Sequence, residues 1–457
     1  MNNTILAIDI GTTSITAVIA QNDMDNKINI LGVSIENSDG INKGLITNIE
    51  GASKAIKEAV QNVSKGVLSN IDSTLVSISS AYTKGIRSVG SVNVPNGQIT
   101  QNEINQVMQM ALYNATIVPE YEVIHVLPIY FKVDDSQLID NPLNMNGARL
   151  EVAVYIVTAK KTALTNIKSA LKSSNLEISN FVLTGYASAI SVLDEQQKKF
   201  GAAVLDIGGS TTDIVCFKGK AIIYNDFLPV GSLNITNDLS VTLHTPPSAA
   251  ETLKIKYANL LPHSNHSDKE DHNIKKVKIP VIGDEQNTKE MPLDSIQLII
   301  HARVEEILIM AKDRIKKSGV ADALGAGIAI TGGMSRLPGI KELAQEVFEN
   351  IPVKIANPIN IRNGYMSFDD PTMSTIVGLL LYGLDPNPSF ELDSNKKLRQ
   401  KRVPTQQHTH TNINLNDIKP NNIHTDHKKQ QESLPRISEH DKAKGVSKIW
   451  KKFSEWF

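Results

Sequence analysis

The same short pattern occurs once near the N-terminus of this chain and once near its middle. It reads Asp9-Ile10-Gly11-Thr12-Thr13-Ser14 in the first place and Asp206-Ile207-Gly208-Gly209-Ser210-Thr211-Thr212-Asp213 in the second. Each copy stands between two short apolar runs, so each predicts a strand, a tight turn and a second strand. A repeated hairpin of this kind indicates a duplicated half-molecule, and it constrains the fold more than any other feature of the chain.

Both turns carry the residue types that bind phosphate. A phosphate needs backbone N–H groups, small side chains that permit close approach, and hydroxyl donors, and Gly11–Ser14 and Gly208–Thr212 supply all three. Because carboxylates repel phosphates unless a cation lies between them, we expect Asp9 and Asp206 to hold a hydrated Mg²⁺, directly or through its water. Simple hairpin turns are the alternative, and they explain one such motif better than two.

A third glycine motif, Thr331-Gly332-Gly333-Met334-Ser335, follows a predicted strand over 327–330 and precedes a predicted helix over 340–348. Its glycines would let an adenosine lie against the backbone. The motif is weak evidence alone, but together with the two hairpins it indicates a site for a nucleotide.

The composition fits a soluble α/β protein with two domains. The 457 residues suffice for two ordinary domains and a large core, and a formal net charge of −1 gives no reason to expect nucleic-acid binding. The single cysteine, Cys216, excludes an internal disulfide, and we expect a buried thiol in a reducing compartment. The first apolar run is interrupted by Asp9 and Gly11, so it predicts neither a signal peptide nor a membrane span.

Periodicity divides the rest of the chain into three blocks. The first block predicts strands over 5–10, 15–20, 28–35 and 75–79 and a helix over 49–63. The second block, residues 84–158, indicates a compact α+β insertion with strands over 89–94, 121–132 and 149–158 and a helix over 101–113. The later elements expected are helices over 162–172, 187–193, 247–261, 296–318 and 374–384, and a hairpin of strands 277–282 and 288–291.

The paired hairpins and the later Gly-Gly turn resemble the nucleotide motifs of the actin-like ATPase superfamily. Four further segments narrow the resemblance to the FtsA family of bacterial cell-division proteins: Gly40–Asn48, Asn141–Val152, Ala250–Lys254 and Arg303–Ile307. The resemblance implies an α/β, actin-like (ribonuclease H-like) duplicated two-domain fold. It also implies an inserted α+β subdomain in the first half, a disordered linker and a C-terminal amphipathic helix.

The resemblance assigns roles to the parts of this fold. The inserted subdomain would serve self-assembly into filaments and contact with later division proteins. Residues 245–318 would contact the C-terminal tail of the tubulin-like protein FtsZ, and the final helix, 374–384, would pack back on the first domain. The expected boundaries are 1–83 with 159–200 for the first domain core, 84–158 for the inserted subdomain, 201–384 for the second domain, 385–441 for the linker and 442–457 for the terminal helix.

ATP and Mg²⁺ are the ligands that the resemblance implies, and the three glycine motifs would bind them. Glu251 and Lys254 stand one helical turn apart and would lie near the ribose and the base. An ordinary exposed helix pair is the alternative explanation for these two residues.

One position departs from the superfamily. Many members carry a Glu-Pro pair before the helix that precedes the second phosphate motif, whereas the corresponding stretch here is Leu183-Thr184-Gly185-Tyr186-Ala187-Ser188-Ala189. Because position 185 offers no carboxylate to orient an attacking water, we expect ATP binding with weak or absent hydrolysis. Asp213 is a further carboxylate in the second turn, and its place indicates support of the hairpin.

The end of the chain predicts a linker followed by a membrane-binding helix. Residues 385–441 are rich in Asn, Gln, Lys, His and Asp and bury too little surface to offset the entropy of ordering. A solvated tract explains the histidines there, and metal binding is the alternative. The terminal segment has one apolar and one basic face, as interfacial helices do. The residues expected at an anionic membrane surface are Val446, Lys448, Ile449, Trp450, Lys451, Lys452, Phe453, Trp456 and Phe457.

These observations predict an ATP-binding, actin-like cell-division protein at the cytoplasmic face of the inner membrane, at the division site. It would polymerise there and tether FtsZ to the membrane while the division ring assembles. A kinase of the same superfamily would need a sugar pocket and a catalytic carboxylate, and a chaperone ATPase would need a peptide-binding domain and a lid. The related actin-like protein of pilus assembly has no reason to carry a membrane-binding tip.

Overall fold

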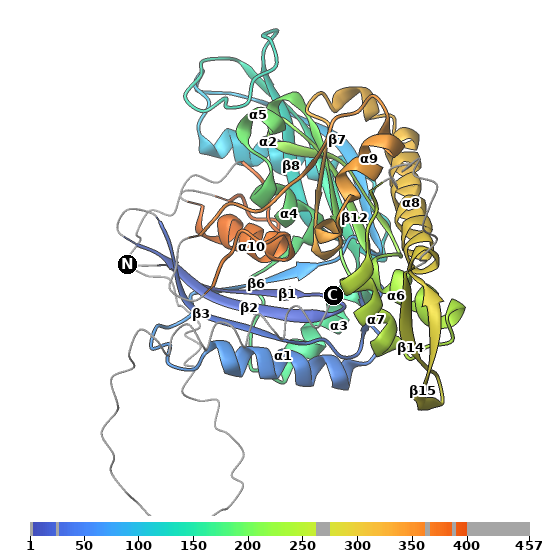
Figure 1. Cartoon of the computed structure of the whole chain (residues 1–457). Coiled ribbons are helices and arrows are strands. Elements are labelled where there is room, and N and C mark those ends of the chain that lie inside the picture. Colours follow the sequence, from blue (N-terminus) through green and yellow to red (C-terminus); the bar gives the residue numbers. More distant parts are fainter. Residues whose placement is uncertain (1–2, 24–26, 262–274, 362–365, 386–389, 400–457) are drawn as a thin grey trace, which may run out of the picture.

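The computed structural model describes residues 3–23, 27–261, 275–361, 366–385 and 390–399. Two five-stranded sheets form its centre, one in each half of the chain. In Figure 1 the first sheet lies below the second, and a smaller, inserted sheet stands at the top. No helix in the described ranges is long and apolar enough to cross a bilayer.

The first sheet has the spatial order β10-β6-β1-β2-β3, in which β1, β2 and β3 are antiparallel neighbours and β6 and β10 continue the sheet in parallel. Helices cover both of its faces, α1 and α3 below and α4 and α10 above (Figure 1). Its strands are β1 (Thr4–Ile10), β2 (Ser14–Asn22), β3 (Ile28–Asn37), β6 (Ser73–Ile78) and β10 (Asn180–Leu183). The helices are α1 (Ile49–Val63), α3 (Lys161–Lys172), α4 (Thr184–Val192) and α10 (Ser374–Leu384). Because both faces are covered, β1 is a continuous apolar run that is buried from Thr4 to Ile8.

The second sheet repeats this arrangement in the order β13-β12-β11-β16-β17. Three strands are again antiparallel and consecutive, and two more are parallel. The hairpin registers agree as well, since Asp9 stands opposite Thr16 and Asp206 opposite Asp213. The strands are β11 (Ala202–Ile207), β12 (Thr212–Lys218), β13 (Ala221–Leu228), β16 (Ile328–Thr331) and β17 (Val353–Ile355). The predicted duplicated α/β fold is therefore confirmed.

Four helices and a hairpin form the outer part of the second domain. The long helix α8 buries one apolar stripe, which includes Ile296, Ile300 and Val304. Between residues 218 and 246 the structure has β13 and α6, two elements that the sequence analysis does not predict. The outer elements are α6 (Ser232–Thr242), α7 (Pro247–Tyr257), β14 (Lys276–Val281), β15 (Asp284–Pro292), α8 (Leu293–Lys317) and α9 (Ile340–Phe348). Shorter elements are β4 (Ile41–Asn42), β5 (Leu45–Ile46), α5 (Glu195–Phe200) and single turns at Ala321–Ala323, Gly333–Arg336 and Pro371–Met373.

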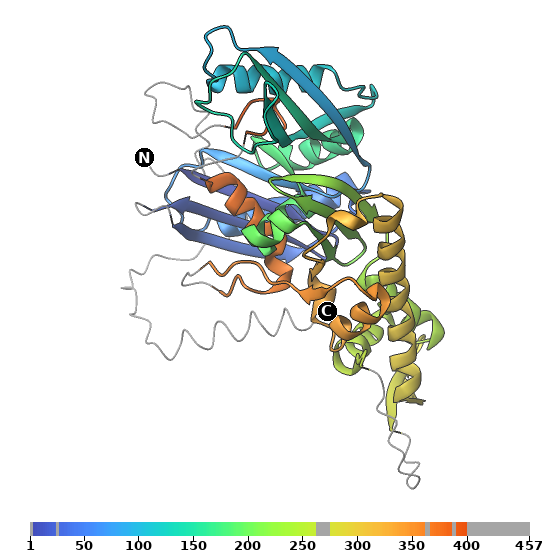
Figure 2. The same ribbon diagram turned by 90° about the horizontal axis from the view of Figure 1, so that it is seen from above.

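The inserted subdomain stands at one edge of the molecule, as the view from above shows (Figure 2). It is an antiparallel sheet in the order β7-β9-β8 with α2 packed on it, and it has a hydrophobic core of its own. Thr100 caps α2 and Glu103 completes a capping box, which fixes the start of the helix at Gln101. Its elements are β7 (Thr83–Asn93), α2 (Gln101–Tyr113), β8 (Tyr121–Val133) and β9 (Arg149–Lys160).

Although it is inserted in the first half of the chain, this subdomain also contacts the second domain. Tyr155 Oη donates a hydrogen bond to Asn225 Oδ1 at 3.0 Å and accepts one from Asn225 N at 3.1 Å. Asn225 Nδ2 donates to Thr83 Oγ1 at 2.9 Å, and Arg87 Nη2 donates to Ile223 O at 3.1 Å. These contacts join β7 and β9 of the inserted subdomain to β13 of the second domain.

Residues 390–399 do not belong to a linker, so the predicted linker boundary at residue 385 is wrong. They pack against the inserted subdomain and the first domain instead, and Leu392 is fully buried in the core of the inserted subdomain. The physical reason is that Leu392 and Phe390 add apolar surface to this core, while Glu391 and Arg399 form an ion pair. The rest of the expected linker from residue 400, and the whole terminal helix, lie outside the described residues.

Candidate functional site

The two hairpin turns meet in a cleft between the domains. Asp9 stands near the end of β1 and Asp206 near the end of β11, and the duplication places both strand ends at this cleft. The cleft is lined by Asp9 and Gly11–Ser14 from the first turn, and by Asp206, Gly208, Gly209 and Thr211 from the second.

Each turn is closed by the same backbone hydrogen bond. Gly11 N donates to Ser14 O at 3.0 Å, and Gly208 N donates to Thr211 O at 2.9 Å. A side chain at position 11 would collide with this turn, since its Cβ would lie 2.7 Å from Ser14 O. Glycine is therefore required for the tight bend that leaves the remaining turn residues facing the cleft.

The two turns touch each other across the cleft. Ser210 Oγ donates to Thr12 Oγ1 at 2.8 Å and accepts from Lys43 N at 3.0 Å. Gly209 lies so close to Thr13 that a Cβ at 209 would be 2.5 Å from Thr13 Cγ2. A phosphate could pass between the turns only after they separate.

Three residues of the expected glycine motifs do not line the cleft. Thr212 Oγ1 donates to Val230 O at 2.9 Å and stabilises the hairpin from within. Met334 is buried in the core of the second domain, whereas its neighbours Gly332 and Gly333 do line the cleft. Ser210 bonds the opposite turn, as described above.

Three carboxylates converge on the cleft, the half-buried Asp9 and the buried Asp206 and Asp213, and this placement makes their ionised forms unfavourable. Burial, together with the nearby charges of Asp206 and Asp213, raises the pKa of the Asp9 carboxyl to about 7. Burial raises the pKa of Asp213 to about 6, although a hydrogen bond of 2.9 Å from Ser80 N opposes the rise. Burial also raises the pKa of Asp206, which accepts hydrogen bonds from Ser188 Oγ at 2.5 Å and Thr375 Oγ1 at 3.3 Å.

The chemistry of these side chains fits a hydrated Mg²⁺. In the described part of the chain, no group of three or more His, Cys, Asp or Glu side chains is placed to hold a metal ion directly. Asp9 and Asp206 nevertheless suit a cation that keeps its own water, because Mg²⁺ often contacts protein through one or two carboxylates. A dication here would favour the ionised carboxylates, which burial disfavours at both positions and which the neighbouring carboxylates disfavour further at Asp9.

Glu251 and Lys254 form a buried pair between α6 and α7 and do not line the cleft. Lys254 Nζ lies 2.9 Å from Glu251 Oε1 and donates to Ser232 O at 3.3 Å and to Thr236 Oγ1 at 3.1 Å. The Lys254 side chain is only 2% exposed, and this burial lowers its pKa even though Glu251 favours the charged form. The alternative of an ordinary exposed helix pair is therefore wrong for Lys254.

Several residues that line the cleft carried no signal in the sequence. Thr184 begins α4, and Ser79 and Gly44 come from connections in the first domain. The segment Pro371–Thr375 reaches the cleft from far along the chain. Asp213 is named in the sequence analysis as support for the hairpin; it accepts the hydrogen bond from Ser80 and also lines the cleft.

Position 185 has no room for the carboxylate that many superfamily members carry nearby. A Cβ on Gly185 would lie 2.6 Å from Val215 Cγ2 and 3.4 Å from Asp213 Cβ. A glutamate there would require the Val215 side chain of β12 to move. The glycine is therefore part of the packing between α4 and the second hairpin.

Comparison with known proteins identifies the family. Models of the cell division protein FtsA and of the SHS2 domain inserted in FtsA match residues 203–378 and 80–158, respectively. A cell division protein FtsA of Helicobacter pylori is 33% identical, over 94% of each chain. The chain belongs to the FtsA family. FtsA of Pseudomonas aeruginosa is 31% identical, over 83% of this chain and 89% of its own. FtsA of Escherichia coli is 27% identical, over 86% of this chain and 93% of its own.

Solved structures confirm that this FtsA-family protein has an actin-like fold. The PilM-PilN type IV pilus biogenesis complex contains a chain with a TM-score of 0.57 and 15% identity, covering 83% of this chain and 98% of that one. MreB5 of Spiroplasma citri bound to ADP has a TM-score of 0.50 and 13% identity, and the match covers 83% of this chain and 96% of the MreB5 chain. The SHS2 match corresponds to the inserted subdomain of β7, α2, β8 and β9. As a member of the FtsA family, the protein is an actin-like cell-division protein.

Proposed function

We propose that this FtsA-family protein binds ATP with Mg²⁺ in the cleft and polymerises at the cytoplasmic face of the cell inner membrane, where it tethers FtsZ. In this role it helps to assemble the division ring and recruits later division proteins. The convergence of two matching hairpin turns, each with its carboxylate, carries the proposal. Hydrolysis would be weak or absent, since position 185 has no room for a carboxylate.

The chemistry of the cleft supports nucleotide binding. The phosphates would lie between Gly11–Ser14 and Gly208–Thr211, whose backbone N–H groups and hydroxyls are donors. The adenosine would lie against Gly332 and Gly333. The related MreB5 structure was determined with ADP bound. Because the two turns touch, ATP would separate them on binding, which gives the nucleotide a means to set the angle between the domains.

Membrane attachment is proposed from the sequence of the tail alone. Trp450, Phe453 and Trp456 share one face of the expected helix, and lysines occupy the other. Each lysine adds about 1 kcal/mol at an anionic surface. One such helix binds reversibly, whereas many helices held together in a filament bind with avidity. Polymerisation and membrane attachment would therefore reinforce each other.

Co-sedimentation with vesicles of phosphatidylglycerol and phosphatidylethanolamine tests this attachment. The full-length chain should pellet with the vesicles, and a chain ending at Asp441 should stay in the supernatant. As a matched control, the full-length Trp450→Glu/Trp456→Glu variant should also stay in solution while it keeps its thermal unfolding midpoint. Equal pelleting of all three proteins would contradict the membrane role.

The partner assignment has its own test. Val241, Ile282 and Leu298 are more than half exposed on the outer part of the second domain, where the FtsZ tail is expected to bind. An immobilised FtsZ C-terminal peptide should retain the protein, and Leu298→Asp should weaken that retention without loss of stability. A scrambled peptide is the control, and equal retention on both peptides would rule out specific recognition.

A further inference from the structure

A buried charge cluster lies where residues 390–399 meet the rest of the protein. The Glu391 side chain is completely buried, and its Oε1 lies 3.4 Å from Arg399 Nη1 and 3.7 Å from His125 Nδ1. Tyr186 Oη donates to Glu391 Oε2 at 2.9 Å. A buried carboxylate is costly unless it is paired, so these partners fix where Glu391 can lie.

The partners of Glu391 come from separate parts of the fold. His125 belongs to β8 of the inserted subdomain, whereas Tyr186 belongs to α4 of the first domain. Arg399 stacks 3.6 Å from the ring centre of Tyr382 in α10 and donates a hydrogen bond to Tyr382 O. His125 Nε2 also accepts from Leu183 N at 3.1 Å. The cluster therefore connects the inserted subdomain to the first domain through the segment itself.

Backbone and side-chain contacts hold the same segment on both sides. Leu392 and Val126 of β8 exchange two backbone hydrogen bonds of 3.0 Å, and Gln109 Nε2 of α2 donates to Lys396 O at 2.8 Å. On the other side, Ser394 Oγ accepts from Phe181 N of β10 at 3.1 Å. Segment 390–399 thus lies between the inserted subdomain and the first sheet.

The segment also has structure of its own. Asp393 Oδ1 accepts hydrogen bonds from Asn395 N at 2.9 Å and Lys397 N at 3.0 Å, and Arg399 N donates to Glu391 O at 2.8 Å. These bonds close residues 391–399 into a compact hairpin-like turn. Such a turn can associate or separate as one unit, because its internal contacts do not depend on the surfaces it covers.

We propose that residues 390–399 are a clasp: an intramolecular docking segment that holds the inserted subdomain to the first domain and that detaches as one unit. Buried ion pairs favour one specific arrangement more than they add stability, which suits a contact that is meant to be made and broken. The clasp also fixes where residues 400–457 leave the body, at the junction with the inserted subdomain and not at the end of α10. The proposal rests on these contacts and not on the proposed function.

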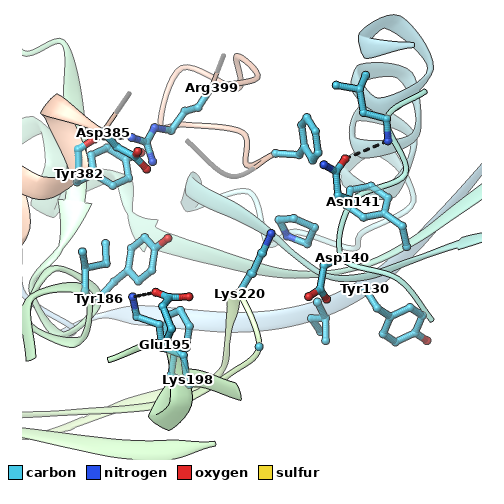
Figure 3. A pocket seen from close by; sticks show the side chains of 18 of the residues that line it. Tyr130, Asp140, Asn141, Tyr186, Glu195, Lys198, Lys220, Tyr382, Asp385 and Arg399 are labelled. Atoms are coloured by element: carbon cyan, nitrogen blue, oxygen red, sulfur yellow. Dashed lines mark hydrogen bonds and ion pairs between the residues drawn. The ribbon is translucent and has the colours of Figure 1, made fainter. Parts of the chain in front are cut away.

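A cavity lies beside the clasp and leaves part of it uncovered by the rest of the protein. The cavity has a volume of about 520 Å³, and Phe390 and Arg399 of the clasp line it. Figure 3 shows Arg399 and Tyr382 on one side of this space and Asp140 and Tyr130 of the inserted subdomain on the other. The Arg399 side chain is 15% exposed and the Glu391 side chain is completely buried, so water contacts the pair only on the arginine side.

Hydrogen exchange of the full-length protein tests the clasp. The amides of Leu392 and Val126 should exchange together, and faster than those of β1 and β11. Glu391→Gln should speed the exchange of both amides at least tenfold and leave β1 and β11 unchanged. Glu151→Gln is the matched control, because Glu151 pairs with the exposed Arg149 in the same subdomain, and it should change nothing.

A locked variant keeps the proposal testable if Glu391→Gln fails to fold. Two residues that exchange both backbone hydrogen bonds have Cα atoms about 5.5 Å apart, which is within the range that a disulfide spans. Oxidation of the Val126→Cys/Leu392→Cys variant should therefore form a disulfide between the clasp and β8. Oxidation should slow exchange of the Phe390–Arg399 amides at least tenfold relative to the reduced protein. Equal amide exchange rates in the oxidised and reduced forms would overturn the clasp. It would also be overturned if, in the wild type, the amide of Leu392 exchanged no faster than the amides of β1 and β11.

Discussion

Asp9 is half-buried beside two other carboxylates, and its ionisation links the stability of the protein to pH. Its pKa of about 7 lies above the ordinary value of 3.8. Between these values the unfolded chain releases the proton while the folded chain keeps it, so the contribution of Asp9 to stability falls as the pH rises through this range. A cation near the carboxylate would restore that loss.

We expect Asp9→Asn to stabilise the nucleotide-free protein. At pH 8 its free energy of unfolding should exceed that of the wild type by on the order of 2 kcal/mol, because a neutral amide has no ionised form to bury. Urea denaturation at pH 8 and at pH 4 measures the effect, which should vanish at pH 4, where both side chains are uncharged in the fold. The same variant should lose Mg²⁺-dependent ATP binding. A variant less stable than the wild type at pH 8 would contradict this account.

At the scale of the element, the two hairpins are the parts that must fit each other. Their turns are in contact through Thr12, Thr13, Gly209 and Ser210. The fit depends on glycine at 209 because there is no space for a side chain. Backbone conformation is not the reason, since the φ of Gly209 does not lie in the left-handed region. An added methyl group should therefore disturb packing and not backbone geometry.

Gly209→Ala should lower the free energy of unfolding by about 1–2 kcal/mol, as overpacking does elsewhere. The new Cβ would lie 2.5 Å from Thr13 Cγ2, an atom that serine lacks. Thr13→Ser in the same chain should therefore recover most of the loss, and Thr13→Ser alone serves as the control. Thermal unfolding of the four proteins gives the coupling energy. If the serine gives no recovery, the turns do not touch in solution.

Most elements of both sheets could be predicted from the sequence, because apolar periodicity and turn residues are local signals. The three glycine motifs likewise identified most of the cleft. Pro371–Thr375 could not be found, since only the folded chain brings them to the turns. The clasp was missed for a similar reason. Its few apolar residues form no periodic pattern. Two of the partners of Glu391 are distant in sequence: Tyr186 lies more than two hundred residues away, and His125 lies farther still.

At the scale of the whole molecule, the inserted subdomain is attached to both domains. The clasp and β10 hold it to the first domain, and the Tyr155–Asn225 contact holds it to the second. The cleft lies between the two domains, and ATP binding there is proposed to change the angle between them. The subdomain therefore spans the same junction from outside.

Tyr155→Phe should weaken this attachment by about 1–2 kcal/mol, because Asn225 N is then buried without its acceptor. Hydrogen exchange should accelerate at β13 and at the facing ends of β7 and β9, while α1 stays protected. Tyr113→Phe is the control, since the Tyr113 side chain is largely exposed in the same subdomain. Unchanged exchange at β13 would show that the hydroxyl contributes nothing to the junction.

The double attachment of the inserted subdomain has a mechanical consequence. A body fixed to both sides of a hinge cannot follow one side alone, so each rotation of the hinge must tilt it or strain one of its anchors. The distal end of such a body travels farther than the hinge itself, as the tip of a lever does. A neighbouring molecule bound to the distal end of the inserted subdomain would therefore be displaced when the angle between the two domains changes.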